Sequence, residues 1–344
     1  MRVLVAMSGG VDSSVAAALL AEAGHEVVGA TMKLWGGPSD SGCCSVADTD
    51  DARRVAQQLG IAHHVFNFSA DFDRDVVAPY VDAHAGGTTP NPCVECNRHL
   101  KFDRFGRRAA QLGFDAVATG HHARVRRGPA GWRLERGADR AKDQSYVLHM
   151  LGQAQLARTV LPVGELTKAQ VRATAAAAGL RTASKPDSQD VCFISRQGGR
   201  DEFLGSRIAL RPGTVVDRDG NKVGETDAVE LVTVGQRRGL GAPPVSKAGR
   251  RYALNVDMGA ATVTVGSLQD LLTDSIGVGA MSWVDRPVEA GTAVEMQASA
   301  HGRAVPATWL GDAVVTREPV RRVAPGQSVV LYDGDAVLGG GIAK

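Results

Sequence analysis

Hydrophobic residues are spaced first as strands and then as helices along the first half of the chain. An apolar run over residues 2–6 is followed by a Gly-Gly turn and by a stretch rich in alanine and leucine that ends at Gly24. Helical spacing that stops at a glycine, with another apolar run after it, returns around Gly60 and Gly113. Strands and helices that alternate in this way are typical of βαβ units. The pattern therefore predicts an α/β domain with a parallel sheet.

The apolar spacing also gives the approximate bounds of the elements. We expect strands over residues 25–34, 63–68 and 115–119, helices over 48–59, 71–85, 97–112 and 165–178, and a hairpin over 125–135. Ligands of parallel sheets bind at the carboxyl ends of the strands, so we expect Ser8, Met32 and Gly120 to lie along one edge.

The second half of the chain has a different texture. From about Arg200, helical runs fade and short Val- and Thr-rich segments follow, separated by turns such as Asp219-Gly220 and Asp333-Gly334. Such segments predict small β units, and a weaker break over residues 268–275 divides them in two. We therefore predict three domains, over residues 1–200, 201–268 and 269–344.

The segment from Met7 to Ser14 reads Met-Ser-Gly-Gly-Val-Asp-Ser-Ser. Glycines let the backbone approach an anion, and the N–H groups of a first helical turn face it. Ser8 and Ser13 add hydroxyl donors, and Asp12 is a candidate ligand for a metal ion on the phosphates. The segment lacks the Gly-Lys-Ser/Thr of a Walker A loop. It resembles the pyrophosphate loop (PP-loop) of ATP pyrophosphatases; the alternative is an ordinary strand-to-helix turn with a serine cap.

Composition and charge narrow the class of protein. The 344 residues carry a net charge of only +2, so total charge does not indicate nucleic acid. Basic residues nevertheless gather over residues 94–127 and 232–251, where they suit either a phosphate backbone or a solvated surface. We find no apolar run of membrane-spanning length and no signal peptide, so we expect a cytoplasmic protein without a membrane partner.

The chain has five cysteines, an odd count that argues against a disulfide framework. Cys93-Val94-Glu95-Cys96 is a CxxC segment with three uses open to it: half of a zinc site completed by Cys43-Cys44 or Cys192, a redox pair, or a catalytic thiol at Cys96. Adjacent cysteines rarely fit a tetrahedral zinc site. We expect Cys96 at the start of the helix over 97–112, where the helix N-terminus and nearby cations favour a thiolate. Spacing alone leaves zinc and catalysis both open.

Several longer motifs point to one family. They are Thr89-Pro90-Asn91-Pro92 with Cys96-Asn97 and Lys101-Phe102, Lys142-Asp143-Gln144-Ser145-Tyr146, Asp187-Ser188-Gln189-Asp190-Val191-Cys192-Phe193-Ile194, Gly235-Gln236-Arg237-Arg238-Gly239-Leu240 and Leu338-Gly339-Gly340-Gly341. Together they resemble the signatures of the bacterial tRNA 2-thiouridylases, the MnmA family. The resemblance covers essentially the whole chain. It implies an adenine-nucleotide α-hydrolase-like (PP-loop) domain followed by two small, mainly β domains, the last a β-barrel.

The resemblance also implies a reaction. ATP adenylates O2 of the wobble uridine of a tRNA, and sulfur then replaces that oxygen to give 2-thiouridine, AMP and pyrophosphate. Cys192 is expected to carry the sulfur as a persulfide. Cys96 is expected to act as nucleophile or to resolve the persulfide, which leaves a Cys96–Cys192 disulfide for reduction. The implied ATP-binding residues are Ala6, Met7, Ser8, Gly9, Gly10, Val11, Asp12, Ser13, Met32 and Gly120, with Mg²⁺ on the pyrophosphate.

The implied partners are a tRNA and a sulfur donor. The tRNA would present the anticodon stem-loop of species with a wobble uridine, such as those for Lys, Glu and Gln. The donor would be a cysteine desulfurase or a relay protein that supplies persulfide. The implied contacts are Asn91, Pro92 and Cys93 beside the target base, His121 near it, and Lys142, Asp143, Gln144 and Gln327 on the tRNA.

The chain departs from the family pattern at two places. Many members have an aspartate where this chain has Cys93, so a thiol stands where a carboxylate acid/base is expected. The three thiols Cys93, Cys96 and Cys192 also permit an iron–sulfur cluster as an alternative. In the last domain, residues 298–302 replace an Arg-Tyr pair that contacts tRNA in relatives, and His301 and Arg303 are the candidate substitutes.

Two further functions stay open at this point. One is a PP-loop ligase or amidotransferase acting on a small carboxylate, against which the paired thiols and the late β domains argue. The other is a zinc- or cluster-bearing RNA-binding module, against which the SGGVDS loop argues.

Overall fold

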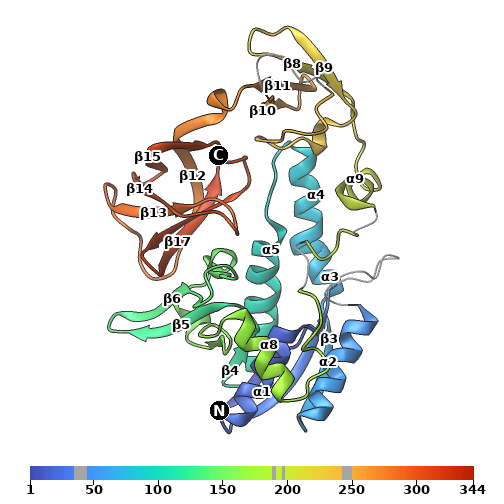
Figure 1. The fold of residues 1–344 in the computed structure, drawn as a ribbon, viewed down its shortest axis with the longest axis vertical. Helices are drawn as coiled ribbons and strands as arrows, with labels where there is room; N and C mark the ends of the chain where they lie inside the picture. Colours follow the sequence, from blue (N-terminus) through green and yellow to red (C-terminus); the bar gives the residue numbers. More distant parts are fainter. Residues whose placement is uncertain (35–44, 188–190, 196–197, 242–249) are drawn as a thin grey trace.

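A computed structural model describes residues 1–34, 45–187, 191–195, 198–241 and 250–344. The chain forms a parallel sheet flanked by helices, a small four-stranded sheet and a β-barrel (Figure 1). Figure 1 places the small sheet at the far end of α4 (Ala78–Ala85) and the barrel beside α5 (Pro92–Glu95). Cys43 and Cys44, with residues 188–190 of the motif before Cys192, lie outside the described residues.

The parallel sheet is buried on both faces. Its strand order is β3 (Ala62–Asn67), β2 (Glu26–Lys33), β1 (Arg2–Ala6), β4 (Ala116–Ala118) and β7 (Thr159–Val160), and every neighbouring pair is parallel. Alternate residues of β1 enter opposite cores: Leu4 joins one, and Val3 and Val5 join the other. A strand covered on both sides reads as a continuous apolar run, which is why residues 2–6 lack polar alternation.

Helices cover both faces of this sheet. The core on one side contains α1 (Val11–Glu22), α2 (Val46–Gln58) and α8 (Lys168–Ala177). The core on the other side contains two long helices, each with a π-helical middle: α3 (Ser69–Phe72) through α4, and α5 through α6 (Phe105–Gln111). The predicted α/β class and the alternation of strands and helices are confirmed, although the short strand β7 was not predicted.

One predicted helix begins five residues earlier than expected. The helix placed over 97–112 starts at Pro92, because the Asn91 side chain accepts a hydrogen bond from the Cys93 N–H at 3.0 Å and Pro92 occupies the first helical position. The expectation that Cys96 starts this helix is therefore wrong. Cys93 lies in the first turn, and Cys96 lies one turn further along the same helix.

Among the described residues of the second half, all regular structure is β apart from the short helix α9 (Gly199–Gly205) and single helical turns. The four-stranded sheet has the order β10 (Tyr252–Asp257), β11 (Thr262–Gly266), β8 (Gly213–Val216) and β9 (Lys222–Thr226). The barrel contains β12 (Leu272–Trp283), β13 (Ala293–Gln297), β14 (Val305–Trp309), β15 (Ala313–Arg321), β16 (Ser328–Asp333) and β17 (Ala336–Ala343), and pairing of β12 with β17 closes it. The predicted β-barrel is confirmed.

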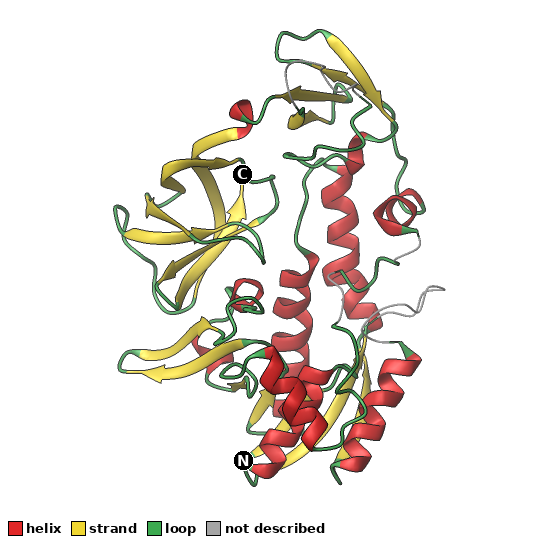
Figure 2. Ribbon diagram, viewed as in Figure 1, coloured by secondary structure: helices red, strands yellow, loops and turns green. Residues whose placement is uncertain are grey.

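A hairpin of the first domain attaches to the barrel. Strands β5 (Ala123–Gly128) and β6 (Gly131–Arg136) continue the barrel's sheet through the pair Glu135 and Ala336 (Figure 2). Beneath them, Tyr146 is fully buried and its hydroxyl donates to the Ser328 carbonyl at 2.8 Å. A shared core therefore holds the barrel against the first domain. No helix in the described part of the chain is long and apolar enough to span a membrane.

Candidate active site

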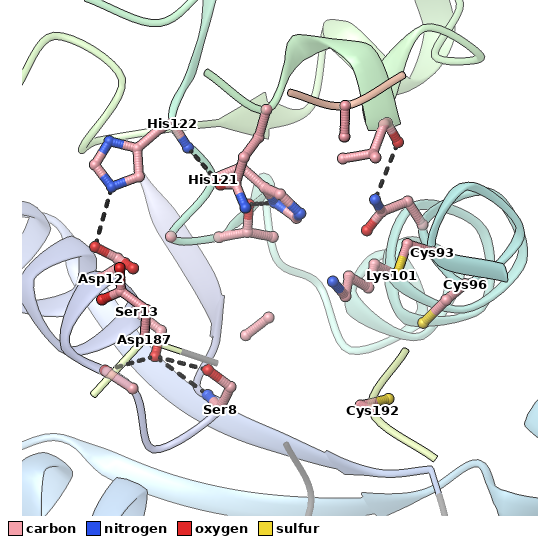
Figure 3. A pocket seen from close by; sticks show the side chains of 18 of the residues that line it. Ser8, Asp12, Ser13, Cys93, Cys96, Lys101, His121, His122, Asp187 and Cys192 are labelled. Atoms are coloured by element: carbon pink, nitrogen blue, oxygen red, sulfur yellow. Dashed lines mark hydrogen bonds and ion pairs between the residues drawn. The ribbon is translucent and has the colours of Figure 1, made fainter. Parts of the chain in front are cut away.

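A cavity of about 420 Å³ opens at the carboxyl ends of β1, β2 and β4 (Figure 3). The first domain supplies most of its wall, and Ala300 and His301 of the barrel domain complete it. Most of the predicted nucleotide-loop, thiol and RNA-contact residues line it: Ala6, Met7, Ser8, Gly10, Val11, Asp12, Ser13, Met32, Pro92, Cys93, Cys96, Gly120, His121, Lys142, Asp143, Gln144 and Cys192. The fold therefore brings together segments that lie up to about 295 positions apart in the sequence, from Ala6 to His301.

The SGGVDS loop is a tight turn held by its own serines. Ser13 Oγ accepts a hydrogen bond from the Ser8 N–H at 3.2 Å and donates to the Gly10 carbonyl at 3.2 Å. Gly9 has a φ of +70°, and a Cβ there would collide with the backbone of Asp48. Helix α1 begins after Gly10 without a side-chain cap, so the serine-capped turn is not what forms. The first-turn N–H groups are left to face an anion.

Gly120 allows the next strand end to approach this loop. A Cβ on Gly120 would lie 2.5 Å from the Ser13 backbone nitrogen, where real Cβ atoms are not found. Close packing of these two turns places His122 beside the first turn of α1, where its Nε2 lies 3.1 Å from Asp12 Oδ1. Met32 and Gly120, both predicted to bind ATP, line the cavity at the ends of β2 and β4, and their contact with ATP stays a prediction.

Asp12 is held by two basic side chains. The Lys168 ammonium lies 2.8 Å and 2.7 Å from its two carboxylate oxygens, and His122 Nε2 lies 3.1 Å from Oδ1. Burial would raise the pKa of the Asp12 carboxyl, but hydrogen bonds from His122 and Lys168 outweigh burial and keep the pKa below its usual range. Asp12 is therefore an anion at neutral pH.

Asp187 forms a second ionic centre, five positions before Cys192. Its carboxylate accepts from Lys142 and Lys168 at 2.9 Å each and from Arg172 at 2.8 Å. Burial opposes ionisation of Asp187, yet the lysine hydrogen bonds hold its pKa far below the usual range. Lys168 consequently bridges the two carboxylates.

His121 is a neutral, buried imidazole on the cavity wall. It is 8% exposed, and its Nδ1 lies 2.7 Å from the Thr119 hydroxyl. Burial, together with the nearby charge of Lys101, lowers the pKa of His121 well below its usual value. His122 is only 3% exposed, so both histidines are buried side chains and do not lie on the protein surface.

Three thiols line the same cavity. Cys93 and Cys96 project from one helix, and Cys192 lies on a separate segment facing Cys96 (Figure 3). The nucleotide-loop residues Ser8 and Asp12 lie on the other side of the cavity in this view. No group of three His, Cys, Asp or Glu side chains in the described ranges is arranged to hold a metal ion. The described thiols as placed do not fit an iron–sulfur cluster or a zinc site, and the zinc site completed by Cys43-Cys44 lies outside the described residues.

Sequence comparison places the chain in a family. Residues 1–196 match the family described as tRNA methyl transferase HUP domain, residues 201–267 its PRC-barrel domain, and residues 273–343 the aminomethyltransferase beta-barrel domain. The chain is 48% identical over 350 residues to the tRNA-specific 2-thiouridylase MnmA of Acidothermus cellulolyticus, covering 98% of this chain and 96% of that protein. The chain belongs to the tRNA-specific 2-thiouridylase family.

The chain is also similar to other relatives in sequence and, more weakly, to solved structures. The MnmA 2-thiouridylase of Roseiflexus sp. is 46% identical, with 99% of this chain and 98% of the relative covered. Among solved structures, the U34-tRNA thiolase NcsA of Methanococcus maripaludis, with its 4Fe–4S cluster, has a TM-score of 0.37 and 18% identity, covering 60% of this chain and 65% of that one. A 4-thiouridine synthetase–RNA complex with bound ATP has a TM-score of 0.38 and 15% identity, covering 56% and 44%. Similarity at this level to the two structures does not bear on function.

Within this 2-thiouridylase-family site, three predicted residues act behind the cavity wall. Gly9 shapes the loop, and Gln327 donates to the Thr89 carbonyl. Asn91 caps the helix over residues 92–111, which carries Cys93 and Cys96 and is called the thiol helix below. Asp143 does line the wall, but its carboxylate accepts from the Gly137 N–H at 2.9 Å and from the Ser145 hydroxyl at 2.8 Å. Its place in RNA contact stays a prediction.

The sequence-based prediction missed Lys168 and Asn97. Lys168 follows Thr167, which forms a capping box with Gln170, and this motif alone indicates that a helix starts at Lys168. Asn97 is 2% exposed and donates to the Val147 carbonyl at 3.0 Å, while its Oδ1 has no hydrogen-bond partner among the described groups. The Cys-Asn pair in the motif was the available signal, but nothing in it shows which partner the amide takes.

The arrangement of Asp12 bears on the expected Mg²⁺. A carboxylate is the ligand type that Mg²⁺ prefers, yet both Asp12 oxygens accept from the Lys168 ammonium. As arranged, Asp12 does not fit a Mg²⁺ ion.

Proposed function

We propose that the protein is a tRNA-uridine 2-sulfurtransferase that consumes ATP to convert a wobble uridine into 2-thiouridine. The observation that carries the proposal is that the PP-loop and two thiols from distant segments, Cys96 and Cys192, line one cavity. A loop that binds ATP would allow an oxygen of the uridine to be adenylated. The two thiols would supply the sulfur that replaces this oxygen. Full-length relatives of the family carry the name of this activity.

The proposed first step is adenylation of the base. O2 of the uridine attacks the α-phosphate of ATP, the bond to the β-phosphate oxygen breaks, and pyrophosphate leaves. C2 of the base becomes electrophilic because AMP is a better leaving group than hydroxide. The uncapped N-terminus of α1 and the Ser8 hydroxyl are the donors for the polyphosphate, and Ser13, whose hydroxyl donates to the Gly10 carbonyl, holds the loop in shape.

The proposed second step delivers sulfur. Cys192 carries a persulfide from a donor protein, and the Cys96 thiolate attacks the inner sulfur. A Cys96–Cys192 disulfide forms, and the released sulfide attacks C2 while AMP departs with the original oxygen. The disulfide then requires a two-electron reductant before the next turnover, and a cellular thiol is the appropriate class.

The target base has to leave its stack to reach this site. A base in an anticodon loop does so at low cost, and the cavity is bounded by Pro92 of the thiol helix and by the neutral imidazole of His121. We propose the wobble uridines of the tRNAs for Lys, Glu and Gln as substrates. Lys142 and Gln144 on the wall, with the basic stretches of the chain, are the proposed phosphate contacts.

The test combines two assays on the full chain. Purified protein is incubated with tRNA, ATP, magnesium and a persulfide donor, and mass spectrometry of the tRNA nucleosides detects 2-thiouridine. Pyrophosphate release is measured with and without tRNA. We expect Cys96→Ser and Cys192→Ser each to abolish 2-thiouridine while ATP binding survives.

Two outcomes would contradict the proposal. Full activity in either cysteine variant would refute the sulfur chemistry assigned to that thiol. Pyrophosphate release that does not depend on tRNA but requires a small carboxylate substrate would instead indicate a PP-loop ligase or amidotransferase. Iron and sulfide analysis of anaerobically purified protein tests the cluster separately: an active, iron-free preparation excludes it.

A further inference from the structure

We propose that Lys168 is a positioning residue that couples ATP binding in the PP-loop to the placement of the segment carrying Cys192. The inference rests on the proposed function, since it concerns how that site times its two steps. Neither the SGGVDS loop nor the cysteine motifs contain Lys168, which enters the cavity from the start of α8.

Lys168 connects the two halves of the reaction through one ammonium group. Its Nζ lies 2.8 Å and 2.7 Å from the oxygens of Asp12, in the PP-loop, and 2.9 Å from Oδ1 of Asp187. Asp187 precedes Cys192 by five positions, and both line the cavity. The Lys168 side chain is only 13% exposed, so solvent and salt screen these contacts weakly.

A polyphosphate in the loop must compete for this ammonium. It carries more negative charge than a carboxylate and forms strong charge-assisted hydrogen bonds with a lysine. Asp12 has Lys168 and His122 as partners, whereas Asp187 keeps Lys142 and Arg172 when Lys168 turns away. Nucleotide binding therefore changes the forces on Asp187 without leaving its carboxylate unpaired.

The backbone next to Cys192 is in a conformation that favours rearrangement. Val191 has a φ of +54°, in the left-handed region that β-branched residues rarely adopt. Such a conformation costs about 1–3 kcal/mol and persists only while surrounding contacts hold it. A change in the ionic contacts of Asp187 is thus able to shift the conformational equilibrium of residues 191–195, which carry the Cys192 thiol.

The experiment reads out Cys192 directly and needs no tRNA or sulfur. Full-length protein is treated with iodoacetamide with and without saturating α,β-methylene-ATP, and peptide mass spectrometry gives the alkylation rate at Cys192. Titration calorimetry measures binding of the same analogue. In the wild type we expect the nucleotide to change the Cys192 rate about fivefold or more, the lower end of usual couplings between sites. Lys168→Met and Asp187→Asn should each bring the ratio of the two rates close to one.

The chain contains a matched control. Lys185 also bridges two carboxylates, lying 2.6 Å from Asp48 and 2.7 Å from Asp51, but it contacts neither Asp12 nor Asp187. Lys185→Met should keep the wild-type rate ratio. Asp187→Asn leaves the Asp12–Lys168 pair intact, so it tests the link even if Lys168→Met binds the analogue weakly.

The outcomes separate this inference from the proposed function. A wild-type protein that does not bind the analogue would contradict the proposed function itself. Binding with an unchanged Cys192 rate would overturn only the coupling. The coupling is also overturned if Asp187→Asn retains the wild-type ratio, or if Lys185→Met loses it as fully as Lys168→Met does.

Discussion

The side-chain amide of Gln327, in the barrel domain, donates a hydrogen bond at 2.5 Å to the carbonyl oxygen of Thr89, which lies 238 positions earlier. The Thr89 N–H in turn donates to the Pro325 carbonyl at 2.8 Å. Gly326, with a φ of +93°, packs against the Thr89 backbone, where a Cβ would lie 3.1 Å from the Thr89 nitrogen. The barrel therefore holds, through two hydrogen bonds, the loop that leads into the thiol helix.

We expect Gln327→Ala to weaken that grip and to affect thiolation more than nucleotide binding. Loss of one hydrogen bond is worth about 1 kcal/mol, which corresponds to about a fivefold lower rate of 2-thiouridine formation. ATP-analogue affinity should not change, because the PP-loop lies on other elements. Gln57→Ala, at an exposed position of α2, removes the same side chain as a control. Equal losses in thiolation and ATP affinity would contradict this division of roles.

We expect Gly9→Ala to reduce ATP-analogue affinity by at least about tenfold, as measured by titration calorimetry. The added Cβ meets the Asp48 backbone at a φ of +70°, so the loop has to move away from the geometry that faces an anion. Gly24→Ala is the control: Gly24 has a φ of +76° but nothing within 4 Å of a Cβ. An equal loss of affinity in both variants would show that backbone strain at any glycine with a positive φ lowers affinity, and not a specific change in the SGGVDS loop.

Cys93 should contribute to adenylation, and Cys96 to sulfur delivery. We expect Cys93→Ala to slow tRNA-dependent pyrophosphate release by about 10²-fold or more, the usual contribution of an acid/base group. Cys93→Asp should restore release and extend it to lower pH, because a carboxyl titrates about four pH units below a thiol. Cys96→Ser, one turn along the helix, should keep pyrophosphate release and lose 2-thiouridine. Normal pyrophosphate release in Cys93→Ala would remove Cys93 from the first step.

The stability of the fold should fall in mild acid because of two buried histidines. Burial, together with the charge of Arg98, lowers the pKa of His149 from 6.5 to about 3, and burial lowers that of His84 to about 4. Below pH 6.5 both imidazoles are protonated in the unfolded chain, whereas in the folded chain they stay neutral until the pH falls to their lowered pKa values. The two histidines therefore do not reduce the free energy of unfolding above pH 6.5. As the pH falls to 5, each of them lowers the free energy of unfolding by about 2 kcal/mol.

His149→Leu tests that assignment by urea unfolding at pH 7 and pH 5. Neither ring nitrogen of His149 has a hydrogen-bond partner among the described groups, so the variant loses no such bond. Between pH 7 and pH 5 the free energy of unfolding should fall less in the variant than in the wild type, by about 2 kcal/mol. An equal fall in both proteins would show that His149 does not titrate on unfolding.

Local pattern predicted the fold well where each element depends on its own sequence. The run over residues 2–6, the helices that end at glycines and the SGGVDS turn between them all carry their signals within a few residues. The start of the thiol helix was misplaced because Asn91 and Pro92 act together as cap and first residue. The strand Thr159–Val160 was missed because two residues carry no periodicity, and it forms only by pairing with β4.

The sequence by itself determined the α/β class and marked the SGGVDS loop and the thiols Cys96 and Cys192 as candidate site residues, because each of these signals lies in contiguous residues. Only the tertiary structure decided that the barrel closes through β12 and β17, that Gln327 holds Thr89, and that Lys168 joins Asp12 to Asp187. The physical reason is that these contacts link residues far apart in the chain. Their geometry follows from how sheets and helices pack, which no local pattern of polar and apolar residues encodes.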